Sequence, residues 1–339
     1  MKLKKNIPLI GITMGDPAGI GPEIITLVLS NPDIYKYCNP VVLGDINILK
    51  KAFALLNKDL KPIKIESVKA ARFKFGQPDI LSLSNLDPNT LTTGMPTEQN
   101  GHAMLLYINK GVELAINKQI DGIATCPVTK TALKLAGSRF HGHTELIANA
   151  TNTKNFNMMF VGQRLKIVLV TIHIPLAEVP NSITLENIFQ TIKNSCSVLK
   201  TNFGINQPCL AVAGLNPHAG ENSMFGNEEH CIIAPAIKRA KKAGFNVSGP
   251  IPPDTLFFNA LKTNQYDCIV CMYHDQGLIP FKMLHFDDGI NTTIGLPIIR
   301  TSCDHGTAYD IAWKGIANPE SLVQAIKSAA FQAQTIKLK

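Results

Sequence analysis

Short apolar runs, each closed by turn residues, are the feature that most limits how this chain folds. They occupy residues 7–13, 41–43, 120–125, 167–172, 210–213 and 266–272. Apolar side chains in these runs are nearly continuous, as in strands that are buried on both faces of a parallel sheet. Helical stretches such as residues 186–199 and 230–243 fit the crossover connections of such a sheet. The sequence therefore predicts an α/β fold.

Length and composition favour a globular protein with more than one core. The chain has 339 residues, of which 45% are hydrophobic and 17% are charged. Residues 77–95, which are rich in proline and threonine, are predicted to form a long loop. No apolar run reaches the roughly 18–20 residues of a membrane span. The basic N-terminus is not followed by a long apolar region, so we expect no signal peptide and a cytoplasmic location.

The eight cysteines predict core thiols and not a metal site. Only Cys268 and Cys271 form a C-x-x-C pair, and residues three apart in a strand face opposite sides. Scattered, unpaired cysteines are typical of a reducing compartment.

The net charge of +8 raises the possibility of a nucleic-acid partner. The excess is nearly all lysine, it is spread along the chain, and no basic stripe with interleaved aromatic residues accompanies it. We therefore interpret it as a solvated lysine surface and predict no nucleic-acid partner. The resulting positive field favours an anionic substrate.

Three histidines directly follow apolar runs that are predicted as strands. His173 follows residues 167–172, His218 lies shortly after residues 210–213, and His274 follows residues 266–272. In open α/β sheets the carboxyl ends of the strands line the ligand crevice. Three imidazoles leave a position open for substrate on a catalytic metal ion. The alternative is that each histidine only hydrogen-bonds its own loop, and their shared position favours the metal site.

Three further segments each allow a structural and a functional interpretation. His143 and Thr144 follow a glycine turn at a predicted helix start, where free amides bind phosphate, although Thr144 also suits an N-cap. Asp254 is an N-cap or a carboxylate delivered to the site. Arg300 is one of five arginines, and its planar fork suits a carboxylate or phosphate, whereas a surface ion pair is the alternative.

The glycine-rich segment 15–23 also follows a predicted strand and precedes a helix. It lacks the G-x-G-x-x-G spacing because Glu23 and Ile24 stand where the third glycine is needed. A phosphate-binding Walker loop is absent as well, so this segment does not predict a Rossmann site.

Taken together, the polar segments resemble the 4-hydroxythreonine-4-phosphate dehydrogenase family from Gly11 to about Ala330. The motifs that carry the resemblance are Gly15-Asp-Pro-Ala-Gly-Ile-Gly-Pro-Glu23, Gly142-His-Thr-Glu145, Asn216-Pro-His-Ala-Gly-Glu221, Tyr273-His-Asp-Gln-Gly277 and Asp304-His-Gly-Thr307. The resemblance implies one divalent ion, Zn, Mg or Co, on His173, His218 and His274. It also implies a homodimer in which the partner supplies the third of these histidines.

The resemblance assigns further site residues. Substrate contacts are implied for His143, Thr144, Lys282, Asn291 and Arg300. The family is related to the isocitrate and isopropylmalate dehydrogenases, whose adenosine-binding loop is similar to residues 305–318. NAD or NADP is thereby expected on a non-Rossmann loop, with His305, Gly306, Thr307, Ala308, Asp310 and Asn318 as contacts. Trp313 stands in this loop where a small residue is expected.

This relationship also implies two α/β domains with an active-site cleft between them. The expected limits are residues 1–130 plus 286–339 for the first domain and 131–285 for the second. The implied reaction oxidises 4-phosphohydroxy-L-threonine, and its keto-acid product then loses CO2. Asp254, Asp275 and Lys282 are the candidates for proton handling. The nearest alternative is a dehydrogenase of erythronate or threonate 4-phosphate.

Overall fold

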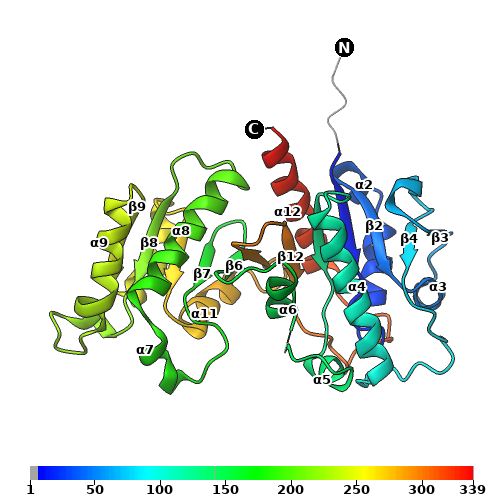
Figure 1. The fold of residues 1–339 in the computed structure, drawn as a ribbon, viewed down its shortest axis with the longest axis horizontal. Helices are drawn as coiled ribbons and strands as arrows, with labels where there is room; N and C mark the ends of the chain where they lie inside the picture. Colours follow the sequence, from blue (N-terminus) through cyan, green and yellow to red (C-terminus); the bar gives the residue numbers. More distant parts are fainter. Residues whose placement is uncertain (1–6, 141, 339) are drawn as a thin grey trace, which may run out of the picture. The chain divides into compact units, whose positions relative to one another are not determined.

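The computed structural model describes residues 7–140 and 142–338, which form two compact units. One unit comprises the described residues up to Lys154 together with those from Leu296 onward, and the other is Asn155–Gly295. Each unit combines a sheet with flanking helices (Figure 1), which confirms the predicted α/β class. The limits of the units lie later along the chain than those predicted at residues 130 and 285.

The sheet of the first unit is parallel. Its strands stand in the order β3 (Ile63–Ile65), β4 (Asp79–Ser82), β2 (Asn39–Gly44), β1 (Leu9–Thr13), β5 (Gly122–Thr125) and β12 (Arg300–Cys303). Val42 packs into one hydrophobic cluster, and its neighbours Val41 and Leu43 pack into another. Both faces of this sheet are therefore buried, as the continuous apolar runs predicted.

Helices cover both faces of this sheet. The unit contains α1 (Gly21–Leu29), α2 (Ile34–Tyr37), α3 (Ile46–Leu55), the short helix η1 (Val68–Ala70), α4 (Glu98–Ile116), α5 (Lys130–Leu135), α6 (His143–Ala150) and α12 (Glu320–Lys337). Apolar side chains of α1, α3 and α12 join one cluster. Those of α6, and Ile108 and Val112 of α4, join the other.

The sheet of the second unit is mixed. Its order is β11 (Ile290–Ile294), β6 (Asn157–Val161), β7 (Lys166–Leu169), β10 (Cys268–Cys271), β8 (Cys209–Ala213) and β9 (Asn246–Ile251). β6 runs antiparallel to β11 and β7, whereas β7, β10, β8 and β9 are mutually parallel neighbours. The carboxyl ends of β7, β10 and β8 therefore meet at one edge of the sheet.

Helices flank this sheet as well. They are η2 (Leu176–Glu178), α7 (Val179–Ser182), α8 (Leu185–Thr201), η3 (Pro217–Gly220), the π-helical turn η4 (Glu229–Ile233), α9 (Ala234–Lys242), α10 (Pro253–Thr263) and α11 (His274–Leu284). Side chains of α8 and α9 form one cluster, and those of α10 and α11 form another. Cys268 belongs to the first cluster and Cys271 to the second, so the pair faces opposite sides as predicted.

Other sequence predictions have mixed outcomes. Each of the six predicted strand runs overlaps a strand, but the prediction of residues 77–95 as one loop is wrong at its start. Asp79–Ser82 forms β4, which pairs with β2 and β3. All eight cysteines lie among the described residues, and each is a free thiol. Within the described chain, no helix is both long enough and apolar enough to cross a membrane.

Residues 131–154 belong to the first unit because α4 and α5 pack closely. A Cβ atom on Gly101 of α4 would lie 2.0 Å from the carbonyl oxygen of Ala132. We therefore expect Gly101→Ala to force the helices apart and to lower the free energy of unfolding by about 1–3 kcal/mol. Urea denaturation measures this change, with the exposed Leu106→Ala on the same helix as control. Equal stability of the two variants would contradict the close packing.

Candidate active site

Two of the three predicted metal-binding histidines lie together in the second unit. His173 follows β7 and His274 begins α11 directly after β10, and these strands are parallel neighbours. The ring centroids of His173 and His274 are 5.7 Å apart. Both line a cavity of about 290 Å³ whose other lining residues include Ile172, Tyr273 and Asp275.

Asp275 contacts the side chain of His274. The Nδ1 atom of His274 lies 2.7 Å from Oδ1 of Asp275. A carboxylate in this position accepts a hydrogen bond from Nδ1–H and leaves the lone pair of Nε2 for a metal ion. The chemistry of this pair fits a metal-binding imidazole.

His218 lies apart from this pair in an exposed loop after β8. Its side chain is 61% exposed, and its ring is 6.0 Å from that of Phe225 between centroids. Within residues 7–140 and 142–338, no three His, Cys, Asp or Glu side chains come close enough to hold a metal ion. A single copy of the chain therefore does not gather the three predicted ligands.

The loop that carries His218 has a strained backbone that a buried carboxylate holds. His218 and Ala219 both have a φ of 52°, in the left-handed region that residues with side chains rarely adopt. The carboxylate of Glu229 accepts hydrogen bonds from the backbone N–H groups of Leu215 and Asn216, both at 2.7 Å. Glu229 is buried, so these bonds are little weakened by water.

A second group of predicted residues lies in the first unit. Arg300 begins β12, and its Nη2 donates a hydrogen bond of 3.0 Å to Oγ1 of Thr125 at the end of β5. The side chain is buried, so Arg300 is not the surface ion pair that was the alternative. Burial lowers the pKa of Arg300 to about 10, so the guanidinium remains charged at neutral pH.

His143 stands at the first position of α6. Its Nε2 atom is buried and has no hydrogen-bond partner within the described part of the chain. Burial, and then the nearby charge of Arg300, lower the pKa of His143 well below 6.5. The N-cap position is taken by Gly142, so Thr144 lies inside the first turn of α6 and does not cap it. A free ring nitrogen beside a guanidinium suits an anionic ligand.

The remaining predicted residues lie in separate places. Asp254 is exposed in the first turn of α10, whose N-cap is Pro252, and its Oδ1 accepts the N–H of Thr255 at 3.0 Å. Lys282 is half-buried on α11, with Nζ 6.0 Å from the ring centroid of Phe286. Asn291 is buried in β11, and its Oδ1 has no partner among the described residues.

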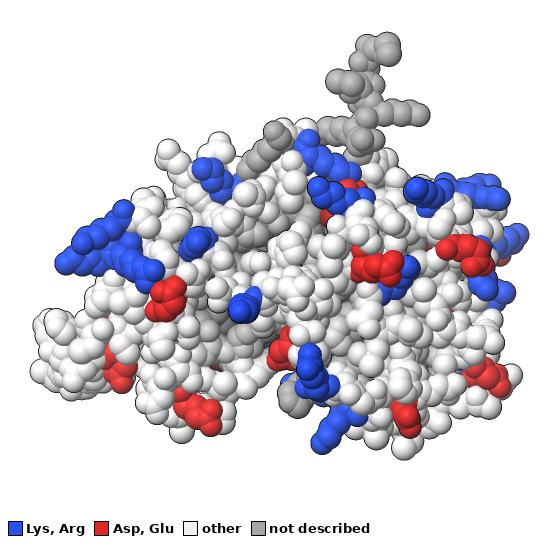
Figure 2. Space-filling model, in the orientation of Figure 1, with Lys and Arg blue, Asp and Glu red and all other residues white. Residues whose placement is uncertain are grey.

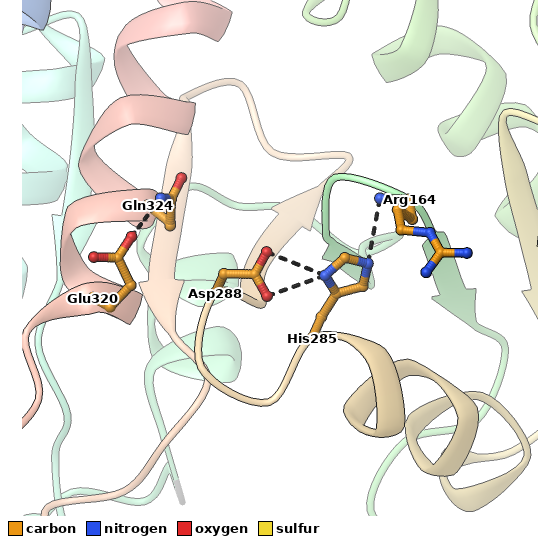
Figure 3. A network of polar contacts seen from close by, with 5 residues as sticks. All are labelled: Arg164, His285, Asp288, Glu320 and Gln324. Carbon is orange, nitrogen blue, oxygen red and sulfur yellow. Dashed lines mark hydrogen bonds and ion pairs between the residues drawn. The ribbon is translucent and has the colours of Figure 1, made fainter.

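His285, which the sequence did not single out, fixes the end of α11. Figure 3 shows its Nδ1 against the carboxylate of Asp288, while its Nε2 accepts the backbone N–H of Arg164 at 3.3 Å. A Cβ on Gly162 would lie 2.3 Å from the imidazole ring, so glycine is needed there. These contacts tie the end of α11, the helix that carries Lys282, to the turn between β6 and β7.

The 305–318 loop contains the residues predicted to bind the cofactor. The Nε2 atom of His305 is buried and lacks a described partner, while Gly306 borders open space. Thr307 lies against Gly19, whose Cβ would be 3.0 Å from Cβ of Thr307. Ala308 adopts a φ of 45°, and Asp310 and Asn318 are exposed.

Several residues that hold the loops and side chains of the candidate site were not predicted, because no local sequence pattern marks the hydrogen bonds that they make. They are Thr125, Glu229, His285, and the buried acids Asp16 and Glu23 of segment 15–23. An available signal was the presence of two acidic residues in an otherwise apolar and glycine-rich stretch. Such residues stay buried only where they meet donors.

Other surface features carry none of the predicted chemistry. A larger cavity of about 620 Å³ in the second unit is lined by Lys193, Cys196, Lys200 and seven other residues, none of which was predicted to be functional. On the face seen in Figure 2, basic side chains form separated groups with acidic side chains between them.

Comparisons with known proteins agree with these motifs. The family described as "Pyridoxal phosphate biosynthetic protein PdxA" matches residues 36–329. The 4-hydroxythreonine-4-phosphate dehydrogenase of Desulforapulum autotrophicum is 57% identical over 97% of this chain and 96% of its own. The D-threonate 4-phosphate dehydrogenase of Cupriavidus necator is 42% identical over 96% of this chain and 97% of its own. The crystal structure of the Klebsiella pneumoniae 4-hydroxythreonine-4-phosphate dehydrogenase has a TM-score of 0.90 and 40% identity, covering 98% of this chain and 99% of that one.

The lowered pKa of His143 gives a testable pH dependence. Below about pH 6.5 the unfolded chain protonates this imidazole, whereas the folded chain does not, so the free energy of unfolding decreases as the pH falls. We expect this decrease to be shallower in His143→Gln, by up to about 1.4 kcal/mol per pH unit. Denaturation curves between pH 7 and pH 5 in metal-free buffer measure it, with the exposed His230→Gln as control for loss of an imidazole. Identical slopes in wild type and His143→Gln would contradict the assignment.

Proposed function

The chain belongs to the pyridoxal phosphate biosynthetic protein PdxA family of dehydrogenases, and we propose that it oxidises 4-phosphohydroxy-L-threonine with NAD or NADP. The C3 hydroxyl becomes a ketone as hydride passes to the nicotinamide and the hydroxyl proton to a base. The product, 2-amino-3-oxo-4-phosphooxybutanoate, loses its carboxylate as CO2 to give 3-amino-2-oxopropyl phosphate. The observation that carries this proposal is 57% identity over 97% of the chain to a relative of that name.

The donor set of the second unit supports a divalent ion, Zn, Mg or Co. His173 and His274 present two imidazoles to one cavity, and Asp275 orients the ring of His274. When bound, the ion supplies positive charge that lowers the pKa of the substrate hydroxyl, and the nicotinamide supplies the hydride acceptor. Nitrogen ligands favour Zn or Co over Mg.

Phosphate binding is assigned to His143, Thr144 and Arg300 of the first unit. The buried guanidinium keeps its charge, and Thr125 fixes the direction of its fork. His143 is neutral near pH 7, so the tautomer protonated on Nε2 donates from that unpartnered atom to a phosphate oxygen. In the second unit, Lys282 and the unpartnered Oδ1 of Asn291 remain proposed substrate contacts.

Proton handling is assigned with different support to the three candidates. Asp275 acts through its contact with Nδ1 of His274 and is therefore a positioning residue. Lys282 and Asp254 remain candidates for the base. The half-buried side chain of Lys282 is better shielded from water than the exposed side chain of Asp254.

Cofactor binding is assigned to the 305–318 loop, with His305, Gly306, Thr307, Ala308, Asp310 and Asn318 as contacts. The buried Nε2 of His305 lacks a described partner and is available to a nucleotide. Gly306 leaves open space beside it, which permits a close approach of a ligand to the backbone.

We propose a homodimer in which the metal site is completed by both copies. One chain brings together His173 and His274 but not His218. The helix α11, which begins at His274, also exposes Ile279 and Met283, and Phe286 follows it with 74% of its surface exposed. Large apolar side chains in such a row are typical of a surface that a protein partner covers.

A second candidate substrate is D-threonate 4-phosphate, which carries a hydroxyl where the first has an amino group. Its support is the 42% identity to the relative from Cupriavidus necator, over nearly the full length of both chains.

The free thiols are consistent with a cytoplasmic location, which we retain as part of the proposal.

The reaction is tested by absorbance of the reduced nicotinamide with purified protein, NAD+ or NADP+ and each candidate substrate. We expect reduction with 4-phosphohydroxy-L-threonine, loss of activity on chelation, and recovery with Zn, Mg or Co. Faster turnover of threonate or erythronate 4-phosphate would select the alternative substrate. Full activity in the chelated protein would contradict the metal-dependent mechanism.

The shared site is tested by mixing two inactive variants, His218→Ala and His274→Ala. If these histidines reach one site from different copies, each mixed dimer keeps one intact site, and random exchange restores about one quarter of wild-type activity. Mixing His173→Ala with His274→Ala tests the pair that lies together in one chain. If His173 and His274 of one copy serve the same site, this mixture recovers no activity, whereas recovery means that they serve different sites. Absence of recovery in both mixtures, with mixed dimers verified by mass, would contradict a site shared between copies.

A further inference from the structure

The 305–318 loop has a backbone conformation that is unfavourable without support from the rest of the structure. Ala308 and Trp313 have φ values of 45° and 61°, in the left-handed region that is unfavourable for residues with a Cβ atom. Gly315 follows with a φ of 74°. A loop with this backbone persists only where the surrounding structure fixes it.

The carboxylate of Glu23 fixes the left-handed part of the loop. Its Oε2 accepts the backbone N–H of Trp313, and its Oε1 accepts the N–H of Gly315 at 2.7 Å. Glu23 is fully buried and lies in the first turn of α1, where the helix dipole stabilises a negative charge. One carboxylate therefore bridges two amides of a segment that is almost 300 residues away in sequence.

Asp16 fixes the other part of the loop. Its Oδ2 accepts the hydroxyl of Tyr309, while its Oδ1 accepts the backbone N–H of Ala18 at 2.9 Å. Burial raises the pKa of the Asp16 carboxyl, and the bonds to Tyr309 and Ala18 oppose this rise. The hydroxyl of Tyr309 thus ties the loop to the same segment that Glu23 closes.

The backbone of segment 15–23 completes these contacts. Ile20 N–H donates to the carbonyl oxygen of Thr307 at 3.1 Å, and the indole Nε1 of Trp313 donates to that of Pro17 at 3.1 Å. A Cβ atom on Gly19 would stand 3.0 Å from both Cβ and the carbonyl oxygen of Thr307, which is a tight contact. Segment 15–23, which lacks the phosphate-binding fingerprint, thus forms a support for the loop.

We propose that Glu23 is a positioning residue, assisted by Asp16, that holds the 305–318 loop in the conformation that receives the dinucleotide. The inference rests on the proposed cofactor role of that loop. A loop ordered in advance pays no ordering cost when the ligand binds. Loss of Glu23 therefore weakens binding of the dinucleotide more than binding of the phosphorylated acid.

Trp313 makes the loop visible in the absence of any ligand, because it is the only tryptophan of the chain. In Glu23→Gln the amide keeps the size of the side chain, but its NH2 group faces one of the two backbone N–H donors. We expect the Trp313 emission of the cofactor-free protein to shift to longer wavelength and acrylamide quenching to increase. The matched control is Glu113→Gln, which changes an exposed carboxylate of α4 that contacts Lys110.

The kinetic readout is the difference between two Michaelis constants. We expect Glu23→Gln to raise KM for the dinucleotide about tenfold or more, the loss typical of a hydrogen bond to a charged group, with less than about twofold change in KM for the substrate. Tyr309→Phe, which removes only the hydroxyl bound to Asp16, should produce a smaller effect in the same direction. This variant keeps the test available if Glu23→Gln does not fold.

The possible results distinguish a failure of the positioning role of Glu23 from a failure of the proposed dehydrogenase activity. Unchanged Trp313 emission in folded Glu23→Gln, or in Tyr309→Phe if the former does not fold, overturns the holding role. A shifted emission with an unchanged KM for the dinucleotide overturns the positioning role. A wild-type protein that binds neither NAD+ nor NADP+ overturns the proposed function instead, and the emission shift still reports on the loop.

Discussion

Buried carboxylates that accept backbone N–H groups hold both of the irregular loops on which the proposed activity depends. Glu23 bridges Trp313 and Gly315 in the first unit, and Glu229 bridges Leu215 and Asn216 in the second. Each loop contains residues with positive φ, so its conformation is unfavourable by itself. Charge-assisted bonds in a dry environment are strong enough to offset that cost. The sheets provide the rigid frame, and these two acids give the loops their shape.

The sequence predicted those strands whose residues are nearly all apolar. Continuous apolar runs lead to β1, β2, β5, β7, β8 and β10 because a doubly buried strand needs apolar side chains on both faces. The strand β11 was missed because Asn291, Thr292 and Thr293 are polar although buried. Its partner β6 is antiparallel, and no local periodicity encodes a pairing between residues so far apart. The unit limits depend on similar long-range packing, as at Gly101.

The candidate site was predicted to a similar extent. The positions of His173 and His274 follow from strand ends that meet at one edge, a rule that needs only the order of elements. The pairing of Arg300 with Thr125, and of Glu23 with Trp313, joins residues separated by most of the chain. Such partners become visible only once β12 lies beside β5 and the loop lies over α1. In the proposed homodimer the third histidine comes from a second copy, and no rule that considers one chain alone predicts such a contact.

The two ends of the second unit lie against each other. Gly295 has a φ of 89°, and a Cβ atom there would stand 2.5 Å from the carbonyl oxygen of Asn155. The segment Asn155–Gly295 thus has the geometry of an inserted module, whose entry and exit points are adjacent. A short peptide bridge is long enough to join such ends, so this junction suits a circular permutation of the chain. A segment with adjacent ends can be exchanged between related proteins without changing the path of the chain on either side of it.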